Sequence, residues 1–545
     1  MFWIPRSFFN LSSFGTVVAA KGEEENNHLS SSVLLGKDDS KKSPLVSFHF
    51  LDEKSRMLQE TIQDVSWVQL GQDIDGECCW SGSSVAMNRK GTRVLIGARE
   101  NDGNGIYSGH ARIFQELEGY WVQLGQDIDG EAEGDWSGEG DMNNDGSRVI
   151  IGAFRNDGEN KSDSGHVRVF EERNGGWVQL GRDIDGESAG DWFGWTVAMN
   201  GKGTRVIIGG LYNDGNGLDS GHARVFEEID GEWVQLGNDI DGEAIGDKFG
   251  SSVDMNDEGS RVIIGAVDNK GEFGQRSGHA RVFEFINGDW MQLGGDIDAE
   301  APFDGFGYSV AMNGSGSRVI IGGKYNNGKN GYKSGHARVY EEADGGNWYQ
   351  IGRDIDGEAP SDLFGDSVSM NEEGSIVIIG SYANDGNGIE SGHARVFEEL
   401  NGDWVQLGKD IDGEFAQDDF GFRVAMNGNG SRIIISGRGH DGENGPNSGH
   451  ARIFEKVDCY KINKRKICNT SGCFWGPDGE GGGVCKSTPN CLTLGKRKTC
   501  KETDGCYWKS NGEGGGRCKN CSDITKKQNC KDQGCTWKGN TETCE

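Results

Sequence analysis

The stretch Trp404-Val405-Gln406-Leu407-Gly408-Lys409-Asp410-Ile411-Asp412-Gly413-Glu414 decides the fold, because the chain contains seven versions of it. Their first residues follow one another at intervals of 54 to 58 residues: Trp67, Trp121, Trp177, Trp233, Trp290, Trp348 and Trp404. The triplet Ser-Gly-His keeps the same step, with its histidines 56 or 57 residues apart: His110, His166, His222, His279, His336, His393 and His450. A unit of about 56 residues copied seven times predicts a repeat architecture.

One copy, from Phe193 to Asp241, predicts four short strands and no helix. Apolar residues alternate with others over residues 193–200, and β-branched residues fill 204–209. Two further strands are expected at 222–227 and 233–237, and the Gly-rich connections predict an antiparallel meander. Because apolar side chains are expected on both faces, each sheet has to be covered on both sides. Seven sheets stacked radially, as the blades of a propeller, satisfy this requirement.

The phase of the array, residues 67–454, predicts how the ring closes. The array begins with a fourth strand and ends with a third strand. We therefore expect Trp67–Leu70 to pair with Ala451–Phe454 and to complete the seventh blade. The predicted fold is all-β, a closed seven-bladed β-propeller of four-stranded antiparallel blades, followed by a small disulfide-rich tail.

Two short motifs give the copies a family resemblance. Phe-Gly opens the first strand of five copies, at Phe193, Phe249, Phe306, Phe364 and Phe420. Gly-Ala or Gly-Gly follows the second strand, as at Gly97, Gly152, Gly209 and Gly265. The array resembles the FG-GAP repeat of the integrin α-subunit N-terminal propeller. That resemblance implies the fold, but the scaffold carries adhesion, lectin and enzyme functions alike. The first two copies deviate, with Trp80-Ser81-Gly82 and Trp136-Ser137-Gly138 in place of Phe-Gly.

Composition limits the partners of the array. Only 34% of the residues are hydrophobic, 91 of 545 are Gly, and the net charge is −32. The tail from Cys459 carries 16 Lys and Arg against 9 Asp and Glu, so the rest of the chain has a net charge of −39. Such an acidic body excludes nucleic acid and anionic membrane surfaces and favours cations or basic partners. Simple solubility explains the charge equally well.

The C-terminal tail contains 12 of the 14 cysteines, in three four-cysteine modules at residues 459–485, 491–518 and 521–544. Such density is typical of extracellular disulfide modules, and two bridges per module are expected with the pairing left open. Zinc is the alternative, although the short Cys-x₂-Cys spacing is absent. The Gly-Cys-x-Trp core is weakly similar to PSI-type repeats. The cysteines are Cys459, Cys468, Cys473, Cys485, Cys491, Cys500, Cys506, Cys518, Cys521, Cys530, Cys535 and Cys544.

The N-terminal segment predicts export without a membrane anchor. Residues 1–25 are interpreted as a degenerate secretory signal, with an organellar transit peptide or a disordered end as alternatives. Residues 26–66 read as a mostly disordered linker. The sequence has no run of about 20 apolar residues, so no transmembrane helix is expected. Asn160 and Asn469 are candidate glycosylation sites of a secreted protein.

Acidic loops are the main candidate site. The Asp-Ile-Asp tract is placed between the fourth strand of one blade and the first strand of the next, and an Asn-Asp-Gly loop joins the second and third strands. Both sets should crowd one face of the disc and offer oxygen ligands to Ca²⁺. The alternative is that these residues only stabilise turns. The tract residues are Asp73, Asp75, Asp127, Asp129, Asp183, Asp185, Asp239, Asp241, Asp354, Asp356, Asp410 and Asp412, and the loop residues are Asp102, Asp157, Asp214 and Asp385.

In integrin propellers calcium occupies an Asp-x-Asp-x-Asp-Gly loop between the first and second strands. The corresponding loops here, such as Asn143–Gly146, lack that triplet, so the resemblance does not transfer the calcium site. The seven Ser-Gly-His histidines are predicted to be structural, because one histidine per blade does not converge on a single ion. Cys78 and Cys79 are either a vicinal disulfide, free thiols or a link to another chain.

The sequence is compatible with two functions. No catalytic triad, phosphate loop or zinc spacing is present, and the copies are nearly uniform. The first hypothesis is therefore a monomeric, secreted or cell-surface binding protein that recognises a glycan or an extracellular protein, requires no cofactor and is assisted by Ca²⁺. The alternative is a secreted polysaccharide lyase or hydrolase with its site at the axial mouth.

Overall fold

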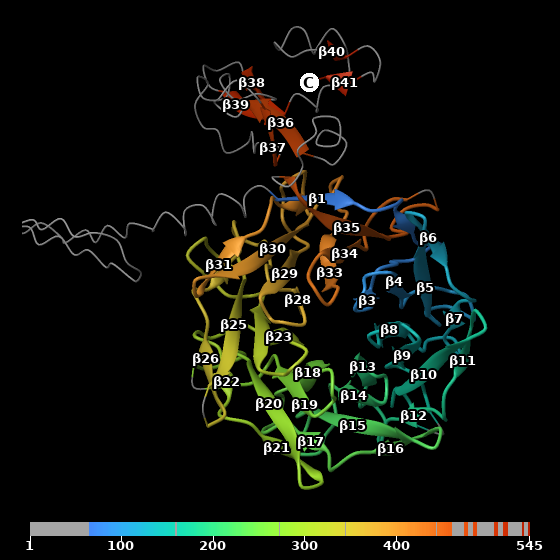
Figure 1. The fold of residues 1–545 in the computed structure, drawn as a ribbon. Coiled ribbons are helices and arrows are strands. Elements are labelled where there is room, and N and C mark those ends of the chain that lie inside the picture. The colour runs from blue at the N-terminus through green and yellow to red at the C-terminus, as the bar shows by residue number, and fades with distance from the viewer. Residues whose placement is uncertain are drawn as a thin grey trace, which may run out of the picture. The chain divides into compact units, whose positions relative to one another are not determined.

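A computed structural model describes residues 65–459, except 159, 160, 272, 344 and 443, together with six short strands between residues 473 and 544. Seven antiparallel sheets follow one another around a ring, so the predicted seven-bladed propeller is confirmed (Figure 1). The described residues contain no helix long and apolar enough to cross a membrane.

Each blade places its first two strands next to the axis. The innermost strands are β3 (Ser84–Met87), β8 (Ser137–Met142), β13 (Phe193–Met199), β18 (Phe249–Met255), β23 (Phe306–Met312), β28 (Ser367–Met370) and β33 (Phe420–Met426). The second strands are β4 (Arg93–Ala98), β9 (Arg148–Ala153), β14 (Arg205–Gly210), β19 (Arg261–Ala266), β24 (Arg318–Gly323), β29 (Ile376–Ser381) and β34 (Arg432–Gly437).

The third and fourth strands form the outer half of each blade. The third strands are β5 (His110–Leu117), β10 (His166–Arg173), β15 (His222–Ile229), β20 (His279–Ile286), β25 (His336–Ala343), β30 (His393–Leu400) and β35 (His450–Asp458). The fourth strands are β6 (Tyr120–Gln123), β11 (Gly176–Gln179), β16 (Glu232–Gln235), β21 (Asp289–Gln292), β26 (Asn347–Gln350), β31 (Asp403–Gln406) and, for blade 7, β1 (Val65–Gln69).

The ring closes through the N-terminal strand, as the phase of the array predicts. Strand β1 pairs antiparallel with β35, with Val65 opposite Asp458 and Gln69 opposite Phe454. The strand begins two residues earlier than expected, so the predicted linker of residues 26–66 is too long at its C-terminal end. Val65 and Ser66 belong to the propeller because Val65 is 3% exposed and packs in the core of blade 7. Residues 1–64 lie outside the described part of the chain.

A belt of backbone hydrogen bonds closes the end of the axis at which the first strand of each blade turns into the second. The turn between the first and second strands of each blade donates to the same turn of another blade, at 3.0 to 3.1 Å. The donors and acceptors run in a complete circle: Arg89 to Asn144, Asn144 to Gly201, Gly201 to Asp257, Asp257 to Gly314, Gly314 to Glu372, Glu372 to Gly428 and Gly428 to Arg89. Such a circle exists only if all seven blades form a closed ring.

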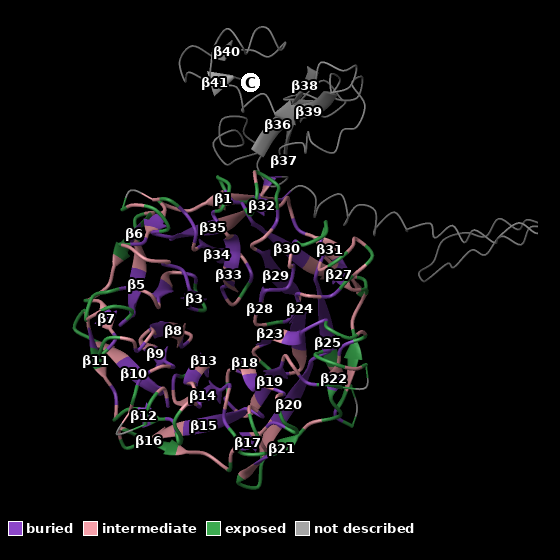
Figure 2. Ribbon diagram, turned by 180° about the vertical axis from the view of Figure 1, so that it is seen from behind, coloured by how far each residue is buried: buried purple, intermediate pink, exposed green. Residues whose placement is uncertain are grey.

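Apolar side chains occupy both faces of each blade, as expected. In β15, Phe226 packs against the cluster shared with blade 2, while Ala223 and Val225 pack against the cluster shared with blade 4. The buried strands lie between the axis and the exposed outer edge (Figure 2). Each repeat tryptophan also donates its indole N–H to a backbone carbonyl of the neighbouring blade, at 2.8 to 3.0 Å. The regular spacing of the Trp residues therefore joins the outer strands of neighbouring blades.

The Phe-Gly motif serves this packing. All five Phe rings are 0% exposed, and each lies under the third strand of its own blade. Gly194 has φ of +91°, and a Cβ at Gly209 would lie 2.3 Å from the carbonyl oxygen of Gly250. Only glycine permits such an approach between blades. In blade 2, Ser137 stands where five of the other blades have Phe, and it is also fully buried. The position therefore stays in the core, although the aromatic ring is missing.

The tail contains three two-stranded hairpins, one in each predicted module. They are β36 (Cys473–Pro477) with β37 (Gly483–Ser487), β38 (Cys506–Ser510) with β39 (Gly516–Asn520), and β40 (Trp537–Lys538) with β41 (Thr543–Cys544). Their side chains, and therefore the predicted bridges, lie outside the described part of the structure, except that Cys459 is fully buried. Asn160 and Asn469 also fall outside it.

Candidate functional site

The Asp-Ile-Asp tract is not purely a connecting loop, which corrects the prediction. Its last two residues form a two-residue strand that pairs with the start of the third strand of the same blade. In blade 3, Ile240 lies opposite Ala223 and Asp241 lies opposite His222. The other strands of this kind are β2 (Ile74–Asp75), β7 (Ile128–Asp129), β12 (Ile184–Asp185), β22 (Ile297–Asp298), β27 (Ile355–Asp356) and β32 (Ile411–Asp412). The strand places the second aspartate beside the buried histidine.

The first aspartate of each tract is held by a glutamine four residues earlier. The Gln side-chain amide donates to the Asp carboxylate at 2.5 to 2.8 Å in every blade, for example from Gln235 to Asp239. In blade 5 Asp354 additionally accepts two hydrogen bonds from the Arg338 guanidinium. These carboxylates therefore have partners supplied by the repeat itself.

The Asn-Asp-Gly loops use their polar side chains in turns. Asn213 Oδ1 accepts the N–H of Gly215 at 2.8 Å, and Asp214 Oδ1 accepts the N–H of Asp219 at 2.9 Å. The same Asp-to-backbone bond recurs at Asp102, Asp157 and Asp385. This is the geometry that the turn interpretation predicts. It leaves the second carboxylate oxygen of each loop aspartate without a role in the turn.

The two loop sets meet, as expected. A Cβ at Gly215 would lie 2.9 Å from Asp241 Oδ1 and 3.0 Å from Asn213 Oδ1, so both oxygens face the same small space. The same pair of oxygens faces Gly103 in blade 1 and Gly386 in blade 6. Blades 1, 3 and 6 are the three copies whose loop reads Asn-Asp-Gly-Asn-Gly.

In these three blades the described residues place no Lys or Arg within ion-pair distance of the second aspartate, and Asp412 has only the His393 ring nitrogen at 4.0 Å. Among the described residues, no side chain donates a hydrogen bond to the carboxylates of Asp129, Asp241 or Asp412. Burial, together with the neighbouring first aspartate, raises their pKa values, and for Asp412 the value rises to about 6. A partly buried carboxylate with raised pKa gains stability from any cation that reaches it.

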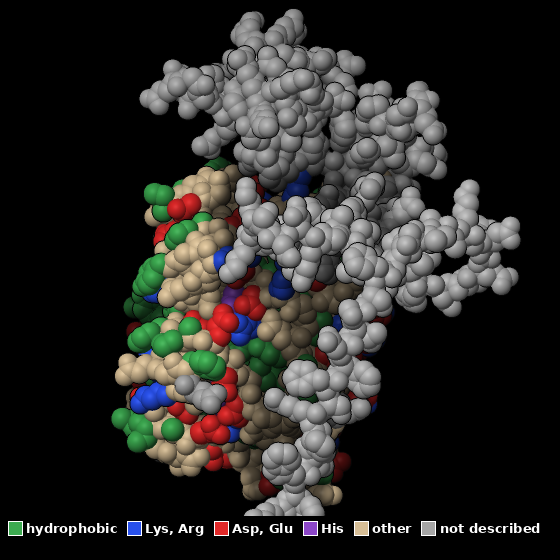
Figure 3. All heavy atoms as spheres, turned by 90° about the vertical axis from the view of Figure 1, so that its left-hand side faces the viewer, with side chains coloured by type: hydrophobic (Ala, Val, Ile, Leu, Met, Phe, Trp, Pro, Cys, Tyr) green, Lys and Arg blue, Asp and Glu red, His purple; other side chains and the backbone are tan. Residues whose placement is uncertain are grey.

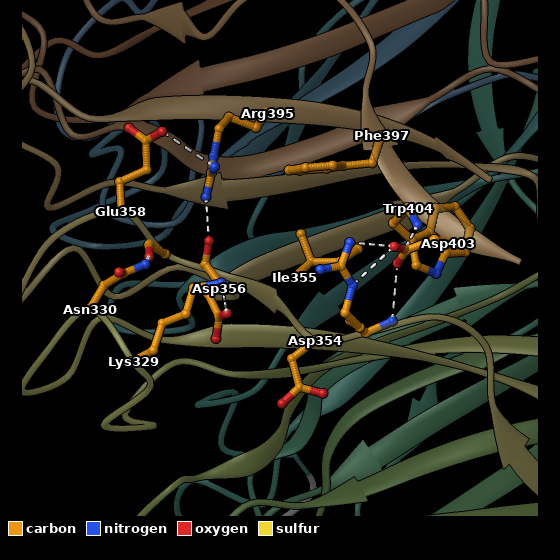
Figure 4. A pocket seen from close by; sticks show the side chains of 12 residues that line it. Lys329, Asn330, Asp354, Ile355, Asp356, Glu358, Arg395, Phe397, Asp403 and Trp404 are labelled. Carbon is orange, nitrogen blue, oxygen red and sulfur yellow. Dashed lines mark hydrogen bonds and ion pairs between the residues drawn. The ribbon is translucent and has the colours of Figure 1, made fainter. Parts of the chain in front are cut away.

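Blade 5 differs because it provides a cation of its own. Its loop carries the additional Lys329, whose ammonium lies 2.8 Å from Asp356 Oδ2. Both residues line a cavity of about 700 Å³ that also contains the Arg395–Glu358 pair and the Arg353–Asp403 pair (Figure 4). The lysine thus occupies the side of the second aspartate that is free in blades 1, 3 and 6.

The Ser-Gly-His histidines are buried against the same tract. They are at most 2% exposed, and the Nδ1 atom of His222 lies 3.8 Å from Asp239 Oδ2. Burial, and next the neighbouring arginine, lowers the pKa of His110, His166, His222, His279 and His393 to about 4 and that of His336 to about 3. The histidines are therefore neutral packing groups at pH 7, in line with the structural role expected of them.

These histidines predict acid sensitivity. Their pKa values are lower in the folded than in the unfolded state, so the unfolded chain binds more protons between about pH 6.5 and pH 4. The free energy of unfolding should therefore fall as the pH is lowered through this window, by about 3 kcal/mol for each histidine. Urea unfolding at several pH values measures the slope. His222→Gln should reduce the slope by up to one proton, and an unchanged slope would contradict the assignment.

A second group of candidate residues, not predicted from the sequence, lies at the axis. The residue after Phe-Gly differs in every blade except two, and it faces the axial cavity in Glu139, Trp195, Ser251, Tyr308 and Asp366. Variation at this position could have indicated the group from the sequence, because a residue that differs between otherwise uniform copies is not required for the packing of the repeat. Its members come from separate blades, so only the ring brings them together.

The vicinal cysteines are free thiols in the structure. Cys79 has a positive φ of 62°, and Trp80 follows with 60°. Burial, together with Cys78, raises the pKa of the Cys79 thiol to about 12. The thiolate needed for exchange or nucleophilic attack is therefore disfavoured at neutral pH.

The match to a protein-family model agrees with this architecture. The family model of the FG-GAP repeat matches residues 184–226 and 355–397, each of which ends in the third strand of a blade. The fold and the matches together define a seven-bladed β-propeller that contains FG-GAP repeats. No curated protein sequence matches the chain. The solved structure of Kuenenia stuttgartiensis hydrazine synthase is similar over 67% of this chain and 93% of that chain, with 10% identity and a TM-score of 0.43.

Proposed function

We propose that the protein is a secreted or cell-surface binding protein of adhesion type, which recognises a glycan or an extracellular protein through the loop face of its propeller. It acts as a monomer and without catalysis, and the disulfide-bonded tail anchors or spaces the disc. Ca²⁺ assists the loop face at three blades. Integrin-like propellers offer the analogy for such a role, and the geometry of the loops supports it.

The observation that carries the proposal is the exposure of large apolar side chains on the acidic loops. Five second-to-third loops each present one: Ile106, Leu218, Phe273, Tyr332 and Ile389, with 45 to 69% of the residue exposed. Ile245, Phe303 and Phe415 are similarly exposed on the connections that follow the tracts. Apolar groups that repeat on one loop face beside polar groups are typical of interaction surfaces. Figure 3 shows the rim of the ring, where acidic and hydrophobic side chains lie among basic and other polar ones.

Calcium fits the three uncompensated aspartates. Carboxylate and amide oxygens on Gly-rich loops are the ligands that Ca²⁺ prefers. Blades 1, 3 and 6 offer Asp Oδ1 and Asn Oδ1 around one glycine. Blade 5 offers the same pair around Gly328, but there the Lys329 ammonium already lies 2.8 Å from Asp356 Oδ2. A site that takes up a lysine ammonium in one copy is suited to a cation in the others.

We expect about three Ca²⁺ ions to bind per chain, with an increase in thermal stability over the protein in EDTA. At a hundredfold excess over Kd each site contributes about 2.7 kcal/mol. Asp241→Asn should remove one ion from the stoichiometry measured by isothermal titration calorimetry. Asp356→Asn is the matched control, because its partner is Lys329, and it should leave the number unchanged. Absence of calcium binding, or equal effects of the two variants, would contradict the calcium sites.

A glycan-array screen of the full chain, with Ca²⁺ and with EDTA, tests the binding function. Binding that is lost in EDTA supports recognition by the loop face. A screen that finds no glycan, followed by an equally negative screen of extracellular proteins, would refute the proposal.

The second candidate, a polysaccharide lyase or hydrolase, is favoured by one observation. Blade 2 places Glu139 and Asp141 at the axis, and burial raises the pKa of both carboxyls, that of Asp141 to about 6. Groups with such values serve general acid catalysis in other proteins. Cleavage of a bound polysaccharide that is abolished by Glu139→Gln would replace the binding function with the enzymatic one.

A further inference from the structure

We propose that the axial cavity is a separate binding site for an acidic sugar residue, one that carries a carboxylate or a sulfate. The proposal deepens the binding function and rests on it, but it is independent of calcium and of the acidic loops. Four features of the cavity carry it: its closed far end, its variable lining, its unpaired guanidinium and its aromatic and hydroxyl walls.

The cavity has the shape of a cup. It measures about 450 Å³, within the range of small-molecule sites. The belt of backbone hydrogen bonds constricts its far end, and the side chains of Arg89, Asn144 and Asp257 reach across the axis there. A ligand therefore enters from the face where the first strands begin and the second strands end. This face also carries the acidic loops.

Variation between the copies is concentrated at this entrance. All seven first strands end in the same Met-Asn pair, and the second strands share a β-branched core. Between these uniform parts, the residue that follows the Gly-Ala motif is different in almost every blade: Arg99, Phe154, Leu211, Val267, Lys324, Tyr382 and Arg438. Of these seven residues, Arg99, Leu211 and Val267 line the cavity. Variable positions that line one cavity are places where a repeat protein can build a specific site.

Charges of both signs line the cavity, namely Arg99, Lys248, Arg276 and Arg423 together with Glu139, Asp141, Asp254, Asp268 and Asp366. Asp268 is paired with Lys248 and Arg276. Asp366 is fully buried and neutralised by Lys324, whose ammonium lies 2.6 Å away, and by Arg423 at 3.4 Å. The guanidinium of Arg99 lines the cavity, and among the described residues no carboxylate lies within ion-pair distance of it. Glu139 is the carboxyl group whose charge acts most strongly on Arg99. Burial raises the pKa of Glu139, which favours its neutral form.

Arg99 is therefore the free cation of the cavity. Its guanidinium carbon lies 5.7 Å from the ring centre of Trp195 and 5.9 Å from that of Phe154, so the aromatic rings hold it in place without neutralising it. A fixed guanidinium in a partly dehydrated cavity binds carboxylate or sulfate oxygens strongly, since two parallel N–H groups point the same way.

The other residues that line the cavity favour an anionic sugar over other anions. Trp195, Tyr308 and Tyr325 line the cavity and are half-buried, although Lys324 lies over one face of the Tyr308 ring and Trp192 stacks on Trp195. Partly exposed aromatic rings of this kind are suited to contact with a pyranose. Hydroxyl groups from several blades, including Ser84, Thr196 and Ser251, complete the lining. The hydroxyls of Ser84 and Ser251 donate to the backbone carbonyls of Gly138 and Gly265, so their oxygens remain to accept a hydrogen bond from a sugar hydroxyl.

The test is calorimetric titration of the full chain in EDTA with three oligosaccharides of equal length: galacturonate hexamer, a sulfated galactan hexamer and a neutral galactan hexamer. We expect at least tenfold tighter binding of one anionic hexamer than of the neutral one, and which anion wins distinguishes carboxylate from sulfate. Arg99→Gln should weaken that binding about tenfold to a hundredfold. Arg173→Gln, on the exposed end of β10, is the matched control and should bind as the unaltered protein does.

Arg99→Lys provides a second variant that keeps the positive charge. It should retain more affinity than Arg99→Gln if the cavity binds the anionic group of the sugar. Thermal unfolding of each variant shows whether the propeller is intact. Equal affinity for the neutral hexamer, or unchanged affinity in folded Arg99→Gln, would overturn the axial site. If such a variant still binds its array glycan with Ca²⁺, the binding function stands and only the axial site fails.

Discussion

Replacing Lys324 with methionine should lower the free energy of unfolding by about 3 kcal/mol or more. The substitution leaves the fully buried Asp366 carboxylate with only the longer contact to Arg423, and an undercompensated buried charge is expensive. Burial opposes the charge of Lys324, yet the Asp366 carboxylate holds the pKa of the ammonium above its ordinary value. Urea unfolding followed by tryptophan fluorescence measures the loss.

A second substitution separates charge from packing. Asp366→Asn in the Lys324→Met background removes the buried charge and should recover most of the lost stability. Lys202→Met is the surface control, because the Lys202–Glu258 pair is more than 60% exposed on both sides, and it should change stability by less than about 1 kcal/mol. Similar losses from Lys324→Met and Lys202→Met would show that the axial ion pair contributes nothing specific.

Val68→Pro should also destabilise the propeller by about 3 kcal/mol, the expected effect of removing a donor and imposing a fixed φ within a paired segment. Leu70 donates to the Ile453 carbonyl, and the two-residue period of the ladder places the Val68 N–H opposite Glu455 in the same way. Because β1 is the strand that closes the ring, loss of its pairing exposes one face of blade 7.

The matched control is Val68→Thr, which retains both the N–H group and a β-branched side chain. Differential scanning calorimetry should show a lower Tm for Val68→Pro and nearly the original Tm for Val68→Thr. An unaltered Tm in folded Val68→Pro would mean that the closing strand is dispensable, and the cyclic belt at the far end of the axis would then have to maintain the ring alone.

The copies themselves explain why so much of the fold was predictable. Each repeat carries its own turn glycines and the Trp that bonds the preceding blade, and five repeats carry the buried Phe, so the same packing signals recur in every copy. The number of blades and the closing strand follow from counting the copies and noting their phase. The third strand runs two residues longer than the pattern suggests, to Ile229, because its end pairs with Glu232 across the hairpin.

The candidate site was predictable only in part. Sequence placed the Asp-Ile-Asp and Asn-Asp-Gly residues on one face, and the contact of Asp241 with Gly215 agrees. It did not indicate which aspartates lack a partner, because the answer depends on where Lys329 and the Gln amides reach. The short strand within the tract was missed as well, since two residues are too few for a periodic signal.

The sequence by itself determined an all-β, seven-bladed ring and the strand that closes it, because these are properties of a unit that recurs at a fixed step. The tertiary structure alone decided the axial cavity. Arg99, Trp195 and Asp366 are far apart in the chain and belong to three different blades, and none of them follows the repeat pattern. Their juxtaposition comes from ring closure, which brings the first strands of all blades to one axis and makes neighbours of residues that no local rule connects.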